Sequence, residues 1–493
     1  MPNSTPFFAA FGSLLCGRAP RGRLQDLLGQ WPRRPSLNQY MEAFGEFIPQ
    51  TLLARSKEKV NSRQRIFSPL VTFWAFLAQV LERGSSCRDA LQRVSAWWQV
   101  HSPAQSSPSA DTSGYCQARA RLEEAVLQQI GTQVAEQLER RVTNQQLWLG
   151  RRVKITDGTC LSMPDTAANQ LQWPQNSNQK PGCGFPQLKV VGLFCLQSGA
   201  LLQVAHDNKH HHELILARRF WHLLQSNEIL LADRGFCSYL DIAQLLGRGV
   251  DCVMRLQQGR GKQDFRRGRR LGHNDRIVLW HKPTQRPPHW SKEEYAQLPK
   301  TLTLRILRFE ITVPGFRSKE VLLATTLLDP KLYPAQELEK LYFRRWNVEL
   351  HFRQIKTMLG MDVLRCLTPE MVLKELAMHQ IAYNLIRALM QRAAITYDVD
   401  LEPFPSKALW TASIITQMPS MPPTASPVNR PSSSMLCFAP SPPIWSPGAP
   451  NAANLALANV AQKTINYLPN LVKKWAPHHT EIGRRIDPKC ALS

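Results

Sequence analysis

Two aspartates each stand at the end of a short, strand-like run. Asp157 follows Val153–Thr156 and precedes Gly158, whereas Asp233 follows Ile229–Ala232. A carboxylate at a strand end, beside a glycine that lets the chain turn sharply, is held on a rigid scaffold at the rim of a sheet. Either aspartate alone is also explained as a turn residue or helix cap, because Asp is common in both places. A third acidic residue is needed before the pair indicates a site.

A predicted helix from Pro334 to about residue 359 supplies that residue, Glu349. Tyr342, Arg345 and Lys356 share its face, because offsets of 0, 3, 7 and 14 residues, at about 100° per residue, fall within roughly 60° of one another. One stripe therefore presents a phenol, a guanidinium, a carboxylate and an ammonium group. A solvated helix face with favourable charge pairs would show the same pattern.

The three carboxylates have the chemistry of a two-metal phosphoryl-transfer site. Carboxylate oxygens suit magnesium, with manganese as an alternative. Two ions roughly 3.5 to 4 Å apart activate the attacking oxygen and stabilise the leaving oxygen of a phosphodiester. Arg345 and Lys356 would hold phosphate groups, and Tyr342 could donate a hydrogen bond to another. We therefore expect a site with two divalent ions.

The overall charge points to a polyanionic partner. The 493 residues include 61 Lys and Arg against 37 Asp and Glu, a formal net charge of +24. Nucleic acid is the commonest partner of such a chain, although a membrane surface or plain solubility would also account for the surplus. The length is typical of about three domains and excludes a small disulfide-stapled scaffold.

Cysteine usage and hydropathy favour the cytoplasm. The eleven cysteines include no CxxC pair, so we expect free thiols rather than a zinc ribbon or a disulfide framework. No run of eighteen apolar residues predicts a membrane span. The apolar stretch Phe7–Leu15 has no basic residue before it, and Arg18 follows it, which argues against a secretory signal.

Periodicity divides most of the chain into three segments. Residues 1–148 show helical spacing of apolar residues, typical of a DNA-binding module or of a merely supporting helical domain. Residues 149–256 alternate strands and short helices, which predicts a mixed α/β fold with a central sheet. Residues 257–333 are basic at first and then rich in strands.

The remainder divides into two more segments. Residues 334–395 carry the helix described above and a second one. Residues 396–493 hold a proline-rich stretch, with twelve of the 36 prolines between Pro403 and Pro450. Such a composition cannot form a regular packed core and predicts disorder, although a shifted reading frame would also explain it.

Two clusters outside the stripe carry notable chemistry. Ten Lys or Arg against two acidic residues lie between Gly259 and Lys292, which predicts a loop that contacts phosphates, with a solvated charged loop as the alternative. Its densest part holds Arg266, Arg267, Arg269 and Arg270. The run His210–Glu213 suggests a metal cluster, but adjacent side chains diverge and no further ligand follows at suitable spacing, so a polar helix start is favoured.

Taken together, these motifs resemble the DDE transposases of bacterial insertion sequences, in the insertion-sequence-four type marked by the YREK signature. The signature is formed by Tyr342, Arg345, Glu349 and Lys356 at their observed spacing. Asp157-Gly-Thr and Asp233-Arg-Gly-Phe match the two preceding motifs, and Leu161–Thr166 and Gly184–Pro186 match their context. The likeness extends from about residue 40 to about residue 395.

The resemblance implies an RNase H-like catalytic core interrupted by a β-strand insertion domain, with an N-terminal helical domain and a C-terminal helical region. The 116 residues from Asp233 to Glu349 would hold that insertion. Asp157, Asp233 and Glu349 would be the catalytic triad and the metal ligands. Tyr342, Arg345 and Lys356 would bind DNA near the cleaved end.

It also implies cut-and-paste transposition. A metal-activated water nicks the transposon end, the freed 3′-hydroxyl attacks the opposite strand to form a hairpin, a second water reopens it, and insertion into target DNA follows. In relatives a flipped base stacks on a tryptophan of the insertion domain, for which Trp280 and Trp290 are the candidates, each also readable as an ordinary core or surface aromatic. The implied partners are terminal inverted repeats, target DNA and a second copy of the chain, in the bacterial cytoplasm at the nucleoid.

Two other functions stay open at this stage. A catalytically idle derivative that binds DNA ends would repress transposition, for instance because the proline-rich tail cannot pair two protein–DNA complexes. A host RNase H-like nuclease would cleave without strand transfer. Short inverted repeats flanking the coding region would count against the nuclease.

Overall fold

The computed structural model describes residues 35–53, 66–102, 109–180, 182–310 and 320–397. The chain forms two compact units, and every described residue except Glu310 belongs to the first, which comprises Met1–Phe309 and Glu320–Met418. The proline-rich stretch, for which the sequence predicts disorder, lies outside the described residues.

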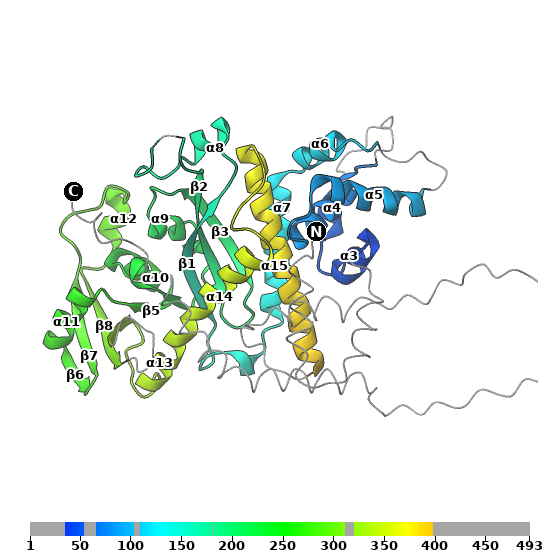
Figure 1. Cartoon of the computed structure of the whole chain (residues 1–493). Coiled ribbons are helices and arrows are strands. Elements are labelled where there is room, and N and C mark those ends of the chain that lie inside the picture. The colour runs from blue at the N-terminus through cyan, green and yellow to red at the C-terminus, as the bar shows by residue number, and fades with distance from the viewer. Residues whose placement is uncertain (1–34, 54–65, 103–108, 181, 311–319, 398–493) are drawn as a thin grey trace, which may run out of the picture. The chain divides into compact units, whose positions relative to one another are not determined.

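One mixed sheet runs through the described part of the chain (Figure 1). Its strands are β1 (Val153–Ser162), β2 (Gln187–Cys195), β3 (Leu201–Asn208), β4 (Ile229–Ala232), β5 (Asp251–Arg255), β6 (Arg269–Gly272), β7 (Asp275–His281), β8 (Thr301–Glu310) and β9 (Glu320–Thr325). The nine strands lie in the order β3-β2-β1-β4-β5-β9-β8-β7-β6. β1, β4 and β5 are parallel neighbours at its centre, and β2 and β3 extend it as antiparallel strands. The mixed α/β class expected from the sequence is confirmed.

The strands of the basic, β-rich segment continue this sheet. β9 pairs with β5 in antiparallel register, Met254 opposite Ala324, and β8, β7 and β6 follow outward. A buried ion pair joins this part internally, because Arg305 donates from Nη2 to Asp275 Oδ2 at 2.6 Å. The insertion expected between the second aspartate and the glutamate therefore shares its sheet with the strand β4 that leads to Asp233.

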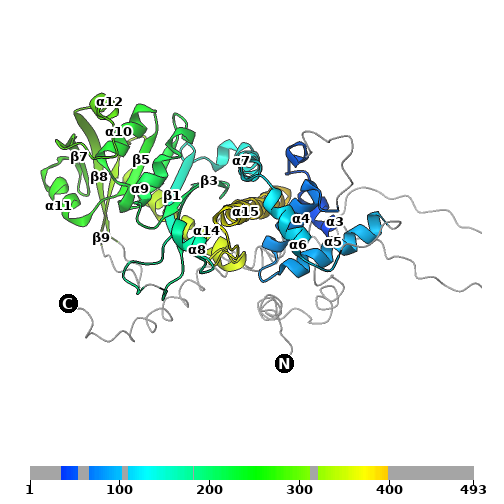
Figure 2. The ribbon, with the colours of Figure 1, turned by 90° about the horizontal axis from the view of Figure 1, so that it is seen from above.

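Helices cover both faces of the sheet. In chain order, the α-helices of the described residues are α3 (Leu37–Phe44), α4 (Pro69–Leu81), α5 (Cys87–His101), α6 (Ser113–Arg121), α7 (Glu124–Arg140), α8 (Ala167–Gln172), α9 (Glu213–Arg218), α10 (Tyr239–Gly247), α11 (Gln258–Arg267), α12 (Lys292–Gln297), α13 (Ala335–Phe343), α14 (Asn347–Arg353) and α15 (Pro369–Tyr397). Figure 2 shows α10 and α14 on opposite sides of the sheet.

The alternation along β2 decides which helix covers which face. Val191 and Leu193 pack into one core with Leu216 of α9 and the apolar side of α10. Gly192, between them, faces the other way, where a Cβ atom would lie 3.1 Å from the ring of Phe352 on α14. Because paired residues of antiparallel strands point to the same side, Asp157, opposite Gly192, also faces α14.

The N-terminal helices form a bundle with α15. α4 starts at Pro69 after the N-cap Ser68, and nine of its thirteen residues are buried. α15 packs against both α4 and α7, so its 29 residues lie between this bundle and the sheet, where Asn384 binds the backbone of Leu201 in β3. The helical character predicted for this part of the chain is therefore observed, while the first 34 residues lie outside the described ranges.

The turn between β2 and β3 gives the first testable prediction. Gly199 has φ +69°, and a Cβ there would lie 2.5 Å from Nη2 of the buried Arg387, which binds the carbonyl of Ser198. We expect Gly199→Ala to lower the free energy of unfolding by about 1–3 kcal/mol, because both the left-handed backbone and the close approach become unfavourable. Gly84→Ala is the matched control, since Gly84 has φ +88° with nothing within 4 Å. Thermal or denaturant unfolding should show a smaller loss for Gly84→Ala; equal losses would exclude the Arg387 contact as a cause.

Two sequence predictions are corrected. The predicted basic loop is wrong as a loop, because Arg266 and Arg267 end α11 while Arg269 and Arg270 lie in β6, where pairing with β7 orders them. The predicted helix from Pro334 is not uniform. It runs as α13, a 3₁₀ turn at Arg344–Trp346, α14 and a π-helical turn at Gln354–Met358, a type of irregularity common at functional sites.

Candidate active site

The parallel pairing of β1 and β4 brings the two aspartates side by side. Thr156 of β1 is in register with Ala232 of β4, so Asp157 and Asp233 occupy the next position on each chain segment. Oδ1 of Asp233 is buried and has no hydrogen-bond partner among the described residues. This is the carboxyl end of the parallel strands, where α/β proteins usually bind ligands.

Arg345 links Glu349 of α14 to Asp157 of β1. α14 packs against β1, and Arg345 of the preceding 3₁₀ turn points between them. Its Nη1 lies 3.5 Å from Asp157 Oδ2, and its Nη2 lies 3.1 Å from Glu349 Oε1. The side chain of Arg345 is only 4% exposed, so the solvated-face interpretation of the stripe does not hold for this residue.

The charges at this point are strongly coupled. Burial raises the pKa of Asp157 to about 6; the charges of Glu349 and Glu213 add to the shift, while the backbone N–H of Gly158 and Arg345 oppose it. Burial alone would lower the pKa of Arg345, but Tyr342 and the surrounding carboxylates raise it. Arg345 is therefore a permanent cation at the centre of the acidic residues.

The donor set fits a hard divalent cation, although no metal is part of the structure. Among the described residues, no three acidic, His or Cys side chains converge as a ready metal site. Arg345 forms ion pairs with both Asp157 and Glu349. Three carboxylates, one with a buried oxygen atom that lacks a partner, are the ligands that magnesium or manganese prefers. For a metal ion to bind here, Arg345 would have to release its contacts with the two carboxylates.

The other two residues of the stripe also contact this region. Lys356 extends from the π-helical turn to β1, where its Nζ donates to Thr159 Oγ1 at 2.9 Å and to the carbonyl of Cys160 at 3.0 Å. Tyr342 is 4% exposed, and burial raises its pKa to about 12, so its hydroxyl stays protonated and can donate. The guanidinium of Arg345 lies 5.9 Å from the ring centre of Tyr342. The four residues of the stripe therefore follow one another from α13, through the 3₁₀ turn and α14, to the π-helical turn.

The raised pKa of Asp157 predicts a pH effect on metal binding. A folded-state pKa near 6, above the usual value of 3.8, means that the metal-free protein holds a proton on Asp157 below that pH. A cation must displace the proton, so affinity is full above pH 6 and is lost as the pH falls. We expect Mn²⁺ affinity, measured by electron paramagnetic resonance, to drop about tenfold per pH unit below about 6. Constant affinity down to about pH 5 would contradict this assignment.

Neither tryptophan candidate is available for stacking in this conformation. Trp280 is 3% exposed and donates from Nε1 to Asp264 Oδ2 at 2.8 Å, and Trp290 is 4% exposed beneath the guanidinium of Arg218. Both rings belong to the core shared by β7, β8 and α10, so the core-aromatic interpretation describes them as they stand. Among the described side chains, Phe185 is the one exposed aromatic, at 62%. The sequence marked Phe185 only as part of the matched run Gly184–Pro186, because exposure cannot be read from composition.

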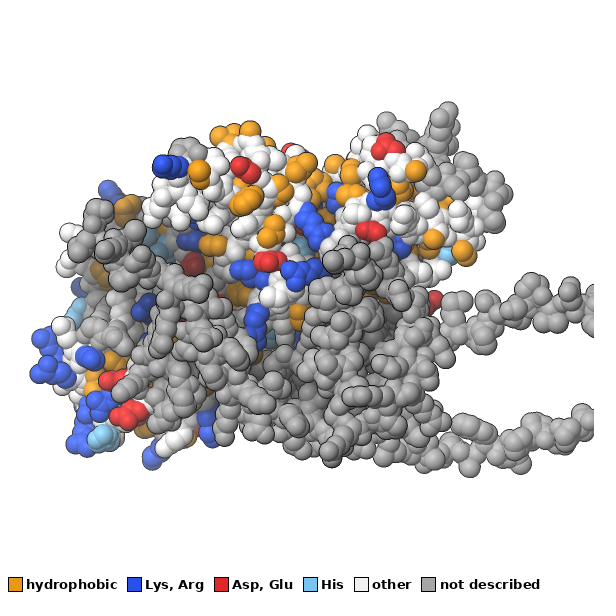
Figure 3. Space-filling view, in the orientation of Figure 1, with side chains coloured by type: hydrophobic (Ala, Val, Ile, Leu, Met, Phe, Trp, Pro, Cys, Tyr) orange, Lys and Arg blue, Asp and Glu red, His pale blue; other side chains and the backbone are white. Residues whose placement is uncertain are grey.

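The four arginines of the densest part of the basic segment, Arg266, Arg267, Arg269 and Arg270, are all exposed. Figure 3 shows Lys and Arg side chains gathered over the region of α11 and β6, on the left of the view. Of the two clusters noted in the sequence, this one is therefore positioned to meet a polyanion. The other, His210–Glu213, begins α9: Nδ1 of His212 accepts a hydrogen bond from the backbone N–H of Leu214, which agrees with the favoured polar helix start.

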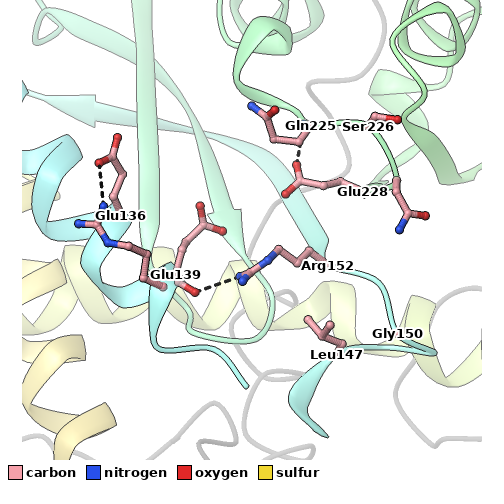
Figure 4. A pocket seen from close by; sticks show the side chains of 10 residues that line it. Glu136, Glu139, Leu147, Gly150, Arg152, Gln225, Ser226 and Glu228 are labelled. Atoms are coloured by element: carbon pink, nitrogen blue, oxygen red, sulfur yellow. Dashed lines mark hydrogen bonds and ion pairs between the residues drawn. The ribbon is translucent and has the colours of Figure 1, made fainter. Parts of the chain in front are cut away.

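A pocket lies at the opposite end of β1, away from the aspartates (Figure 4). Its volume is about 500 Å³, and Glu139, Glu228 and Arg152 are among its lining residues. Beside it, the buried Lys154 forms ion pairs with both glutamates. Glu139 and Glu228 are thus already paired with Lys154. The pocket is remote from the catalytic candidates, because it lies where β1 begins at Val153 and Asp157 comes later in the strand.

Comparison with known proteins finds transposases similar to this chain. Residues 148–385 match the family model described as a transposase DDE domain. The chain is 26% identical over 380 residues to the transposase InsG for insertion sequence element IS4 of Escherichia coli K12, covering 76% of this chain and 81% of that protein. It is 25% identical to the transposase for insertion sequence element IS421 of Escherichia coli, covering 66% of this chain and 85% of the relative.

A solved structure of the piggyBac transposase synaptic complex with hairpin DNA aligns with a TM-score of 0.42 at 10% identity, over 78% of this chain and 77% of that one. No helix in the described ranges is long and apolar enough to span a membrane.

Proposed function

Because the chain belongs to the DDE transposases of insertion sequences, we propose that it moves its own element by cut-and-paste transposition with two divalent ions, magnesium or alternatively manganese. DNA transposase activity follows from the family, as does metal-dependent strand cleavage. The observation that supports the mechanism is that Arg345 contacts both Asp157 and Glu349, while strand register puts Asp233 beside Asp157 at the carboxyl end of β1 and β4.

The three carboxylates would hold the ions, which supply Lewis acidity to the attacking and leaving oxygens of the phosphodiester. Arg345 would then turn from the carboxylates to the phosphate beside the cleaved bond, where its planar fork suits two phosphate oxygens. Tyr342 would donate its hydroxyl proton in a hydrogen bond to the same strand. Lys356, already on β1, would bind the next phosphate.

The reaction sequence that we propose comprises nicking, hairpin formation through the 3′-hydroxyl, reopening and insertion into target DNA. Its scaffold would be an RNase H-like core formed by residues 149–256 and 334–395, interrupted by residues 257–333. Residues 1–148 would bind DNA, and two copies of the chain would act on paired ends at the nucleoid. The parallel strands β1, β4 and β5 with antiparallel β2 and β3 support this core.

The exposed arginines of α11 and β6 would contribute contacts to phosphates that are indifferent to sequence. We expect the double substitution Arg266→Gln/Arg267→Gln to weaken DNA binding about tenfold at moderate salt. The plot of log K against log salt should become less steep by roughly 1.8, because two counterion-releasing contacts are lost. Fluorescence anisotropy over a salt series measures both quantities. Lys331→Gln, at an exposed position outside this cluster, should leave the slope unchanged, and an unchanged slope in the double variant would remove the cluster from the DNA interface.

A cleavage assay tests the function. The full chain is incubated with DNA that carries the terminal inverted repeats of its element, with and without Mg²⁺. Metal-dependent nicks with 3′-hydroxyl ends, followed by hairpins, are the expected products. If the protein binds the ends but never nicks them at any metal concentration, the repressor function replaces the one proposed here.

A further inference from the structure

Glu213 lies directly behind Asp157, on the other face of the sheet. Alternate residues of a strand point to opposite faces, so Asp157 faces α14 and Gly158 faces α9, which Glu213 begins. A Cβ atom on Gly158 would lie 2.5 Å from both Cδ and Oε1 of Glu213. The carboxylate therefore rests against the backbone of β1 at the residue next to Asp157.

This contact explains why residue 158 is a glycine. The sequence suggested that glycine lets the chain turn after Asp157, but β1 continues to Ser162 and the φ of Gly158 is not positive. The glycine instead leaves room for the approach of Glu213, since any side chain at this position would displace the carboxylate.

The carboxylate of Glu213 lacks a cation. No hydrogen bond or ion pair to it exists among the described residues, although it is partly buried. Among the described residues, Arg345 is the cation that Asp157 and Glu349 share. Asp157, Glu349 and Glu213 together thus carry more negative charge than the guanidinium of Arg345 neutralises. A divalent ion would reduce the remaining repulsion.

We propose that Glu213 is a positioning residue whose charge, acting through the backbone of β1, strengthens the binding of divalent cations to Asp157 and its partners. It is not itself one of the three ligands. The inference rests on the proposed function, since it concerns the same site, but part of its test needs no catalysis.

The test compares two glutamates at the starts of two helices of equal length. Glu213 and the exposed Glu293 each lie in the first turn of a six-residue helix, α9 and α12. We expect Glu213→Gln to weaken Mn²⁺ binding to the full chain about tenfold, measured by electron paramagnetic resonance without DNA. The Mg²⁺ concentration for half-maximal nicking should rise by a similar factor, with the rate at saturating metal within about twofold of wild type. Glu293→Gln should match wild type in both.

Gly158→Ala provides an independent route to the same effect. Its methyl group would displace the carboxylate of Glu213 and should also raise the metal requirement. Because both changes remove the same interaction, the metal requirement of the double variant should be no higher than that of the more affected single variant.

The outcomes separate this inference from the proposed function. Unchanged Mn²⁺ affinity in Glu213→Gln overturns the inference, as does a loss of nicking that no concentration of metal restores. If the wild type never nicks yet Glu213→Gln still binds Mn²⁺ about tenfold more weakly, the inference stands and the proposed reaction fails.

Discussion

Asp233→Asn is expected to lower DNA cleavage by at least about 10³-fold while leaving DNA binding intact. Asparagine keeps the shape of the side chain but supplies neutral oxygen and nitrogen atoms in place of an anion. Several kcal/mol of transition-state stabilisation depend on metal ions held by that charge. Oδ1 of Asp233 is buried and unpartnered among the described residues, so no other interaction there compensates. Single-turnover nicking of end-containing DNA measures the effect.

The control for this substitution is Asp329→Asn. Asp329 is exposed, and its Oδ1 accepts a hydrogen bond from the backbone of Lys331, which an asparagine oxygen can also accept. Its cleavage rate should equal that of wild type. Nicking by Asp233→Asn within tenfold of wild type would mean that Asp233 is not a metal ligand.

The second large effect is expected for Arg345→Ala, with about 100-fold slower cleavage. The substitution removes the cation that contacts Asp157 and Glu349 and the proposed phosphate ligand. In the absence of metal we also expect the free energy of unfolding to fall by about 1–2 kcal/mol, a modest figure because Glu349 is 47% exposed. Added Mg²⁺ should restore part of that stability by replacing the missing charge.

Arg345→Lys and Lys340→Ala complete this experiment. A lysine ammonium cannot form the forked contact with two carboxylates, so Arg345→Lys should lie between wild type and alanine in rate. Lys340, 71% exposed on α13, should tolerate alanine. Thermal unfolding with and without Mg²⁺ checks the stability claim, and equal loss under both conditions would show that Arg345 does not stand in for an ion.

The sequence predicted the elements around the site because their patterns are strong. The run before Asp233 is wholly apolar, as a central parallel strand must be, and the helical spacing of apolar residues predicted for residues 1–148 is seen in α4. The prediction that the basic segment is a loop was wrong because charge indicates only solvent exposure. The end of a helix and an edge strand are exposed as well. The pairing of β6 with β7 orders it.

Contacts between distant residues could not be predicted in the same way. That Arg345 lies between Asp157 and Glu349 depends on how α14 packs on β1, which no local pattern specifies. Likewise, a tryptophan in a β segment has the same composition whether its ring faces the core or the solvent. Only the packing shows that Trp280 is inside.

The pairing of β9 with β5 joins residues 257–333 to the sheet that carries the candidate active site. Removing residues 257–333 would strip β5 of one neighbour and leave a bare, apolar edge one strand away from the segment that carries Asp233. Unprotected edges of this kind template aggregation. We therefore expect a chain from which residues 257–333 have been excised to aggregate before its chemistry could be tested.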